Sequence, residues 1–177
     1  MPADLTVRRF EPGDGEAVRE LNERAMARTP EWVPEAPDAD LADVPGHYFE
    51  DGEFLVGTVD GDLVATAAYE PLDGWMAEQL PALKSDGEGC DESTVELSRM
   101  RVDPDHWGQR LGTRVYEELE RRARTDGYRT FVLNTGVENE RARGFYAAPR
   151  FDHVRDERVT VGDVTMHLSL YRRSLVE

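Results

Sequence analysis

The chain has 177 residues, enough for a single domain over residues 1–177, and its one cysteine, Cys90, excludes an internal disulfide. Aspartate and glutamate number 37 against 21 basic residues, which gives a formal net charge of −16. The acidic residues are spread along the chain, so the composition argues against a nucleic-acid-binding surface, which needs a basic stripe, and no apolar run is long enough to span a bilayer.

The first predicted elements are a strand and a helix. Residues 5–10 alternate between apolar and polar, which is typical of a strand. A turn follows, and Asp14 is a candidate N-cap for a helix whose apolar residues recur at helical spacing. Those residues are Val18, Leu21 and Ala25.

A proline-rich segment and a hairpin come next. Residues 28–46 hold four prolines and predict a loop or short helical pieces, with Trp32 as an anchor. Residues 54–69 predict a hairpin, because Asp60-Gly61 separates two runs of strand-forming residues. Residues 70–94 form a long connection in which Trp75, Met76 and Leu80 could make a short helix.

The stretch from residue 95 to residue 113 predicts a strand, a sharp turn and the start of a helix. Residues 95–102 contain no glycine or proline, and Pro104 then ends the strand because proline lacks a ladder N–H. From Leu111 the apolar residues recur every four positions, as on one face of a helix. Gly108 and Gly112 allow the backbone to approach a ligand closely, and a helix start offers N–H groups to an anion such as phosphate.

The C-terminal third predicts a strand at 128–133, a short helix at 139–148 and closing strands at 151–159 and 164–171. Strands and helices therefore mix along the chain, which indicates an α/β or α+β fold.

The 95–113 stretch resembles the pyrophosphate-binding segment of the GNAT superfamily, the acyl-CoA-dependent N-acyltransferases. Val102-Asp103-Pro104 and Gly112 fit the family pattern, whereas Trp107 replaces the usual Gln or Arg and Arg110 replaces the usual middle glycine. Arg110 could point away from the phosphate or pair with it. The resemblance implies the GNAT fold, a mixed central sheet of about seven strands with flanking helices and a splayed cleft for CoA.

The resemblance also implies which residues bind acetyl-CoA, without a metal. Backbone N–H groups of Met100, Arg101 and Val102 would hold the thioester carbonyl. The positions matching the phosphate-binding run are Trp107, Gly108, Gln109, Arg110, Leu111, Gly112 and Thr113.

Glu96 matches a glutamate that some family members use as a general base, usually through water. Strand alternation would place Glu96, Ser98, Met100 and Val102 on one face, where partial burial would raise the pKa of the glutamate. The alternative is a structural carboxylate paired with one of the many arginines.

The last helix looks like the family motif that contains the catalytic acid. Asn139, Ala142, Phe145, Tyr146 and Phe151 fall in register, while Arg150 replaces a usual glycine. Tyr146 would donate a proton to the departing CoA sulfur, and Asn139 would hydrogen-bond the arm of the cofactor. A packed aromatic residue and a helix N-cap are the alternatives. The four histidines lack metal-ligand spacing, although His106 lies beside the predicted phosphate turn.

These patterns predict an N-acetyltransferase that moves an acetyl group from acetyl-CoA to a primary amine of a small metabolite or peptide N-terminus, by direct attack in a ternary complex. The alternative is a non-catalytic CoA-binding or protein-interaction domain, which Arg110 and Arg150 favour. Family members are often dimers, so a homodimer is possible on this resemblance. The N-terminus does not resemble a signal peptide, and we expect a cytoplasmic protein without membrane or nucleic-acid partners. The acidic composition suits a salt-accumulating halophile, the alternative being an ordinary acidic protein.

Overall fold

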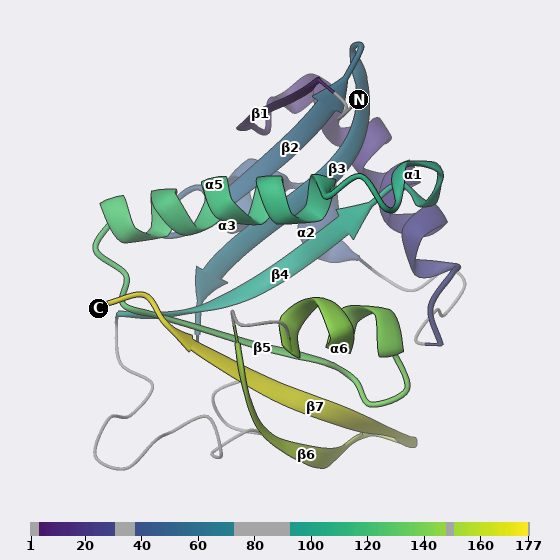
Figure 1. Ribbon diagram of the computed structural model, residues 1–177, viewed down its shortest axis with the longest axis vertical. Coiled ribbons are helices and arrows are strands. Elements are labelled where there is room, and N and C mark those ends of the chain that lie inside the picture. Colours follow the sequence, from purple (N-terminus) through teal and green to yellow (C-terminus); the bar gives the residue numbers. More distant parts are fainter. Residues whose placement is uncertain (1–3, 31–37, 73–92, 148–150, 177) are drawn as a thin grey trace. The chain divides into compact units, whose positions relative to one another are not determined.

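The computed structural model describes residues 4–30, 38–72, 93–147 and 151–176 (Figure 1). The chain forms two compact units. The N-terminal unit comprises Met1–Glu70 and Leu97–Thr125, and the C-terminal unit comprises Pro71–Glu96 and Asp126–Glu177.

The strands of the described residues form one seven-stranded mixed sheet with the order β1-β2-β3-β4-β5-β7-β6. The strands are β1 (Leu5–Arg9), β2 (Glu53–Val59), β3 (Asp62–Pro71), β4 (Thr94–Val102), β5 (Thr130–Gly136), β6 (Asp152–Val161) and β7 (Val164–Ser174). The pairing of β4 with β5 is parallel, while β1–β2, β2–β3, β5–β7 and β6–β7 are antiparallel. This architecture confirms the predicted α+β class and strand count.

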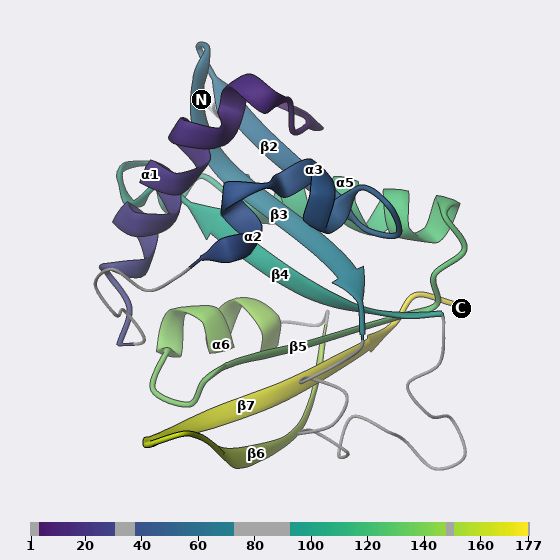
Figure 2. The same ribbon diagram turned by 180° about the vertical axis from the view of Figure 1, so that it is seen from behind.

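Helices cover both faces of the strands in the N-terminal unit. Figure 1 shows α5 (Leu111–Thr125) across one face, and Figure 2 shows α1 (Gly15–Met26), α2 (Ala39–Ala42) and α3 (Val44–Tyr48) on the other. The core on the second face joins side chains from these three helices to β2 and β3. Its buried members are Phe10, Val18, Leu41, Val44, Tyr48, Phe54, Val56 and Ala68.

The apolar stripe predicted for α5 is buried, which fixes how the helix lies on β1 and β2. Leu111, Val115, Leu119 and Ala123 are almost completely inaccessible to solvent. Gly57 of β2 permits the close approach, because a Cβ there would lie 3.1 Å from Val115 Cγ2. The start of α5, where phosphate binding is predicted, is therefore positioned by a packed helix.

The hairpin and the proline-rich segment agree with the sequence predictions. Asp60 and Gly61 have φ values of 52° and 84°, the left-handed pair that a tight two-residue turn requires. The described part of residues 28–46 forms short helical pieces, namely α2 and the start of α3. Trp32 and the possible helix at 75–80 lie outside the described residues.

Asp14 precedes α1 as predicted, but its carboxylate does not cap that helix. It accepts hydrogen bonds from the Glu11 N–H at 2.8 Å and from Arg8 Nη1 at 2.7 Å. The reason is a 3₁₀ turn over Pro12–Asp14, which brings the carboxylate back to the preceding residues.

In the C-terminal unit, β5, β7 and β6 are joined by antiparallel pairing, and α6 (Glu140–Ala147) contacts β6. Its core includes Val132, Val159, Leu168 and Leu170. The strand predicted at 128–133 begins two residues later, at Thr130, and continues to Gly136.

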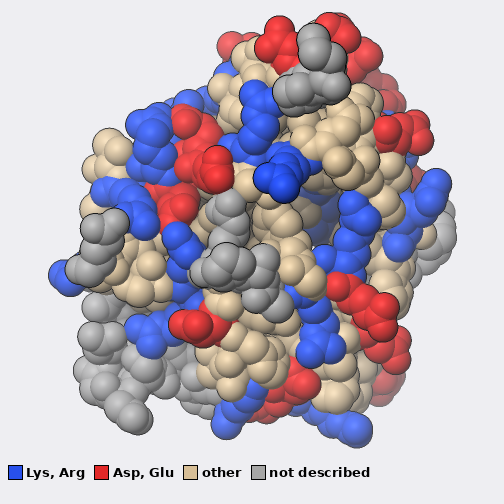
Figure 3. Space-filling view, viewed as in Figure 1, with Lys and Arg blue, Asp and Glu red and all other residues tan. Residues whose placement is uncertain are grey.

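Charges of both signs lie side by side on the surface. Figure 3 shows arginines interspersed with acidic residues on the face drawn, as expected from charges spread along the whole chain.

Candidate active site

The strand β4 contains a break in its extended backbone directly before the predicted carbonyl-binding residues. Arg99 has a φ of 51°, a left-handed conformation that is uncommon for a residue with a side chain. Such a residue disrupts the local ladder, so the pleat does not continue regularly through it. The predicted alternation from Glu96 to Val102 therefore does not hold across Arg99. Met100, Arg101 and Val102 follow this break and are half-buried.

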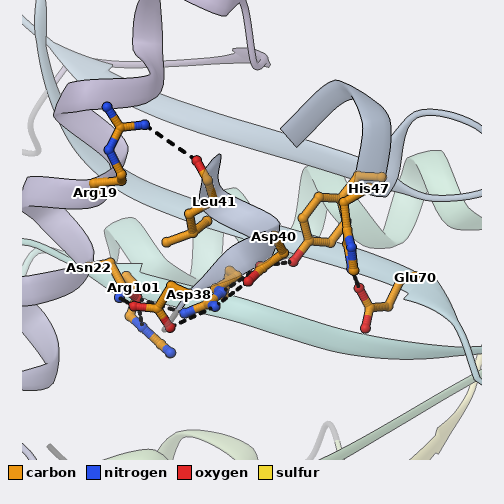
Figure 4. Close-up of polar contacts among 10 residues, drawn as sticks. Arg19, Asn22, Asp38, Asp40, Leu41, His47, Glu70 and Arg101 are labelled. Atoms are coloured by element: carbon orange, nitrogen blue, oxygen red, sulfur yellow. Dashed lines mark hydrogen bonds and ion pairs between the residues drawn. The ribbon is translucent and has the colours of Figure 1, made fainter. Parts of the chain in front are cut away.

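The side chain of Arg99 is held by what we name the Arg99 cluster: Asn22, Asp38, Asp40, Tyr48 and Arg99 (Figure 4). Arg99 donates two hydrogen bonds to the Asp40 carboxylate, from Nε at 2.9 Å and from Nη2 at 2.6 Å. It also donates to Asp38 Oδ1 at 3.1 Å and to Asn22 Oδ1 at 3.2 Å. The Tyr48 hydroxyl donates to Asp40 Oδ2 at 2.6 Å. Side chains of α1 and α2 therefore meet at Arg99 of β4, and Tyr48 of α3 holds the Asp40 carboxylate.

The electrostatic interactions in this cluster keep both Asp40 and Arg99 in their charged forms. Burial by itself raises the pKa of Asp40, but hydrogen bonds from Arg99 and Tyr48 outweigh burial and keep that pKa below its ordinary value. Burial also raises the pKa of Tyr48, and the Asp40 carboxylate raises it further, so the phenol stays a donor. For Arg99, burial lowers the pKa, but the hydrogen bond and charge of Asp40 leave it raised.

Asp103 fixes the turn that follows β4. Its backbone N–H donates to the Val64 carbonyl of β3 at 2.8 Å. Its carboxylate accepts from the Asp105 N–H at 3.0 Å, which caps a 3₁₀ turn over Pro104–His106, and from Arg24 Nη2 of α1 at 2.8 Å. Burial raises the pKa of Asp103, but these hydrogen bonds outweigh it and lower the pKa overall. The turn is thus tied to β3 and to α1.

Trp107 has a structural role that the sequence did not indicate. Its indole Nε1 donates to the Val102 carbonyl at 3.0 Å, so the ring ties the turn back to the end of β4. This contact accounts for a tryptophan at a position where the family usually has Gln or Arg.

The predicted phosphate turn has the backbone of a glycine-rich loop although it contains an arginine. Gly108 has a φ of 85°, with open space where a Cβ would lie, and Arg110 has a φ of 61°. Arg110 therefore adopts the conformation for which a glycine would be favoured. Gly108, Gln109 and Arg110 are exposed, and α5 begins at Leu111. The N–H groups of its first turn lack partners within the helix, as at any helix start.

Arg110→Gly is expected to raise the free energy of unfolding by about 1 kcal/mol, because a left-handed residue with a side chain costs roughly 1–2 kcal/mol. Gly108→Ala should have the opposite effect, by a similar amount of about 1 kcal/mol. Urea unfolding of both variants and the wild type measures this. An Arg110→Gly protein less stable than the wild type would contradict the explanation.

The same variant separates the two roles considered for the Arg110 side chain. If the guanidinium pairs with a phosphate, Arg110→Gly weakens acetyl-CoA binding while it stabilises the fold. If the side chain points away, the affinity does not change.

The other predicted site residues lie in the C-terminal unit. Glu96 is half-buried at the end of the short parallel pairing of β4 with β5, opposite Val132. Met100–Val102 and Trp107–Thr113 belong to the N-terminal unit, whereas Glu96, Asn139 and Tyr146 belong to the C-terminal unit.

Asn139 caps the helix that carries Tyr146. Its Oδ1 accepts from the Ala142 N–H at 3.1 Å, and its backbone carbonyl accepts from the Arg143 N–H at 3.0 Å. Oδ1 of Asn139 therefore acts as the helix N-cap, as one of the two alternatives expected.

Tyr146 lies in an aromatic cluster and is 8% exposed. Its ring centroid is 5.1 Å from Phe145, 5.5 Å from Phe151 and 6.0 Å from Tyr171. The cluster locks the ring, as a positioned proton donor requires, and it also agrees with the packing alternative. Cys90 and Arg150 lie outside the described residues.

Comparison with known proteins identifies the family. The profile described as the acetyltransferase (GNAT) family matches residues 16–150. The chain belongs to the GNAT acetyltransferase family. The predicted resemblance and the predicted enzyme class, acyltransferase, are confirmed by this match.

Individual GNAT relatives agree in sequence and in fold. Mycothiol acetyltransferase of Cellulomonas flavigena is 32% identical over 141 residues, which cover 78% of this chain but only 38% of that protein. An N-acetyltransferase of Staphylococcus aureus Mu50 superposes with a TM-score of 0.75 at 20% identity, covering 98% of this chain and 100% of that one. The acetyltransferase yncA of Salmonella typhimurium, whose structure holds acetyl-CoA, gives a TM-score of 0.74 at 21% identity, covering 98% and 95%. These two structures show that the chain has the GNAT fold.

Within the described residues, no group of three or more His, Cys, Asp or Glu side chains is arranged to hold a metal ion. The helices of those same residues are too short or too polar to cross a membrane.

The sequence analysis did not predict the Arg99 cluster, nor a second polar contact between His47 of α3 and Glu70 of β3. His47 Nε2 lies 2.6 Å from Glu70 Oε2. The partners are 23 residues apart in the chain. No local sequence pattern connects residues so far apart, so this contact could not be predicted from the sequence.

Proposed function

We propose that this GNAT protein transfers the acetyl group of acetyl-CoA to a primary amine of a small metabolite or a peptide N-terminus, by direct attack in a ternary complex. The observation that carries the proposal is the turn before α5, where Gly108 and Arg110 both have positive φ. This backbone exposes residues at a helix start, the usual place for a phosphate group. Family membership, the acetyl-CoA in the Salmonella relative and the name of the Cellulomonas relative support the same chemistry.

The residues of the N-terminal unit fit the cofactor. Open space at Gly108 leaves room for a phosphate, and the run from Trp107 to Thr113 would bind the pyrophosphate through backbone N–H groups. The N–H groups of Met100, Arg101 and Val102, next to the break at Arg99, would polarise the thioester carbonyl. Acetyl-CoA supplies an activated acyl carbon and a thiolate leaving group.

Two residues of the C-terminal unit would move protons. We assign to Tyr146 the donation of a proton to the departing thiolate, and to Glu96 the removal of the proton that leaves nitrogen as the C–N bond forms, through water. Asn139 Nδ2 would hydrogen-bond the pantetheine arm. Arg110 in place of the usual glycine favoured the non-catalytic alternative. Because Arg110 nevertheless adopts the left-handed backbone that a glycine would adopt, it no longer favours that alternative.

The deciding experiment is a calorimetric titration with acetyl-CoA in molar KCl, with NAD as the control ligand. We expect binding of acetyl-CoA alone, followed by thiol release when amines are added. A folded protein that binds acetyl-CoA but releases no thiol with any amine would favour the non-catalytic alternative, and no binding would overturn both.

Salt should not weaken this binding. The chain has a formal net charge of −16 and CoA is an anion, so they repel at low ionic strength. Salt screens that repulsion, whereas short backbone hydrogen bonds persist. We expect the affinity for acetyl-CoA to hold or rise between 0.1 M and molar KCl, and a steep monotonic fall would contradict the assignment.

The acidic composition also supports a cytoplasmic protein of a salt-accumulating organism. The single domain over residues 1–177 and a homodimer stay predictions from the sequence.

A further inference from the structure

The carbonyl group of Arg99 is held by a side chain of the neighbouring strand. Thr66 lies on β3, which is next to β4 in the sheet, and its Oγ1 donates to the Arg99 carbonyl at 2.7 Å. Thr66 is 2% exposed, so solvent competes little for this hydrogen bond. The contact lies at the break in β4, where the left-handed backbone of Arg99 interrupts the regular pleat. It fixes the carbonyl of the residue directly before Met100.

This hydrogen bond also determines the direction of the Met100 N–H. The peptide bonds of the described residues are trans, and in a trans peptide the carbonyl of one residue and the N–H of the next point in opposite directions. Because the Arg99 carbonyl points toward Thr66, the Met100 N–H points away from β3. It is therefore directed toward the other edge of β4, where the described pairing with β5 covers only Thr94–Glu96.

The peptide group at the end of β4 has the reverse orientation. The Asp103 N–H donates to the Val64 carbonyl of β3 at 2.8 Å, and the Val102 carbonyl accepts from Trp107 Nε1 at 3.0 Å. Here the N–H faces β3, so the Val102 carbonyl points away from that strand. The Met100 N–H and the Val102 carbonyl thus point to the same edge of β4, the edge that β3 does not occupy.

Both ends of Arg99 are held, which restricts rotation of the peptide that follows it. The side chain is bound within the Arg99 cluster, and the carbonyl is bound by Thr66. The next carbonyl, that of Met100, accepts from Arg101 Nη1 at 3.1 Å, while Arg101 Nε donates to Asn22 Oδ1 of α1 at 2.9 Å (Figure 4). The peptides on both sides of Met100 are therefore tied to side chains of the N-terminal unit.

We propose, on the basis of the proposed function, that Thr66 is a positioning residue that directs the Met100 N–H at the thioester carbonyl of acetyl-CoA. An N–H stabilises the negative charge that develops on a carbonyl oxygen only if it is aimed at that oxygen before the reaction. Thr66 acts through the Arg99 carbonyl rather than on the cofactor itself. Without its hydroxyl, the peptide between Arg99 and Met100 loses one of its two anchors and can rotate.

The test replaces Thr66 by valine, which keeps the size of the side chain and removes the donor. We expect kcat to fall by about 10- to 100-fold, because the N–H is no longer held in the direction of the carbonyl. The KM for acetyl-CoA should change by less than about threefold, since the phosphate contacts at the turn before α5 persist. Thr66→Ser keeps the hydroxyl and should retain kcat within about threefold of the wild type.

Infrared difference spectroscopy measures the polarisation of the thioester without turnover. The probe is acetyl-CoA labelled with carbon-13 at the thioester carbonyl, bound to each variant in the absence of an amine. A hydrogen bond to the oxygen weakens the C=O bond and lowers its stretching frequency. We expect a lower frequency on the wild type and on Thr66→Ser than on Thr66→Val. Packing alone would not produce this difference.

Thr58→Val is the matched control. Thr58 lies on β2 opposite Leu63 of β3, and β2 is not next to β4 in the sheet. Removal of this hydroxyl should change neither kcat nor the carbonyl frequency. Thr66→Ala is a second variant without the hydroxyl and should behave as Thr66→Val if the valine does not fold. Titration with acetyl-CoA checks that each variant is folded and binds the cofactor.

An equal kcat, or an equal carbonyl frequency, in Thr66→Val and the wild type would overturn the role of Thr66. A loss in Thr66→Ser as large as that in Thr66→Val would also overturn it, because the effect would then come from the methyl group. Wild-type protein that binds acetyl-CoA yet releases no thiol with any amine would instead overturn the proposed function, and the infrared comparison would still test the direction of the Met100 N–H.

Discussion

Tyr146→Phe should lower kcat by about 100-fold at pH 7, because a positioned general acid contributes roughly 10²–10⁴-fold to a rate. The substitution removes only the hydroxyl from a ring that Phe145, Phe151 and Tyr171 hold in place. The loss should shrink above about pH 8.5, where an alkyl thiol leaves readily as the thiolate. Thiol release from acetyl-CoA between pH 6 and pH 9.5 measures both effects.

Tyr171→Phe is the matched control for Tyr146→Phe, because it removes a hydroxyl from the same aromatic cluster. Tyr171 is 1% exposed and its ring contacts Tyr146. We expect its kcat to stay within a few fold of the wild type, and acetyl-CoA affinity to be equal in both variants. A Tyr146→Phe enzyme with unchanged turnover across this pH range would refute the acid role and leave Tyr146 as a packing residue.

Arg99→Met should lower the free energy of unfolding by about 3 kcal/mol, because removing one partner of a buried ion pair leaves an uncompensated charge. The Arg99 side chain is 16% exposed and that of Asp40 is 15% exposed. Urea unfolding at pH 7 in KCl measures the loss. Arg121→Met is the control and should cost much less, because the Arg121 side chain is 62% exposed and its partner Glu118 still pairs with Arg122.

Lowering the pH should reduce the difference in free energy of unfolding between Arg99→Met and the wild type. In the wild type the pKa of Asp40 is depressed, so its contribution is present above the unfolded pKa of about 4 and is lost as the pH falls through the lower folded value. In Arg99→Met the Asp40 carboxylate is buried without its cation, so protonation at low pH removes the cost of burying that charge.

The double variant Arg99→Met/Asp40→Asn should recover more than half of the stability lost in Arg99→Met, since the amide carries no charge and still accepts from Tyr48. The ion pair would not stabilise the fold if the stability difference between Arg99→Met and the wild type grew at lower pH. The same conclusion would follow if the double variant recovered none of the lost stability.

Local patterns predicted the elements well, because each depends on residues close together in the chain. The Asp60-Gly61 turn and the buried stripe of α5 follow from backbone preference and helical period alone. The motif around Tyr146 was likewise recognisable, since its residues lie on one short helix or within a few residues of its ends.

Contacts between distant residues could not be predicted in this way. Nothing near Arg99 indicates that its side chain meets Asp38 and Asp40 some 60 residues earlier, at separations of 61 and 59. The left-handed backbone of Arg99 was equally hidden, because arginine has no preference for it and tertiary contacts enforce it. The prolines and acidic residues at 28–46 predicted only a loop or short helical pieces, although Asp38 and Asp40 of that segment bind the Arg99 side chain of β4.

The anchoring of Asp103 connects two parts of the N-terminal unit. A single carboxylate binds the first helix of the chain through Arg24 and the turn before α5 through the Asp105 N–H. If a ligand at the turn moves this carboxylate, Arg24 of α1 must move with it or lose its hydrogen bond, and α1 also contributes Asn22 to the Arg99 cluster. Linkage is reciprocal, so any factor by which a ligand at the turn changes the affinity for a second ligand beside α1 acts equally in the other direction.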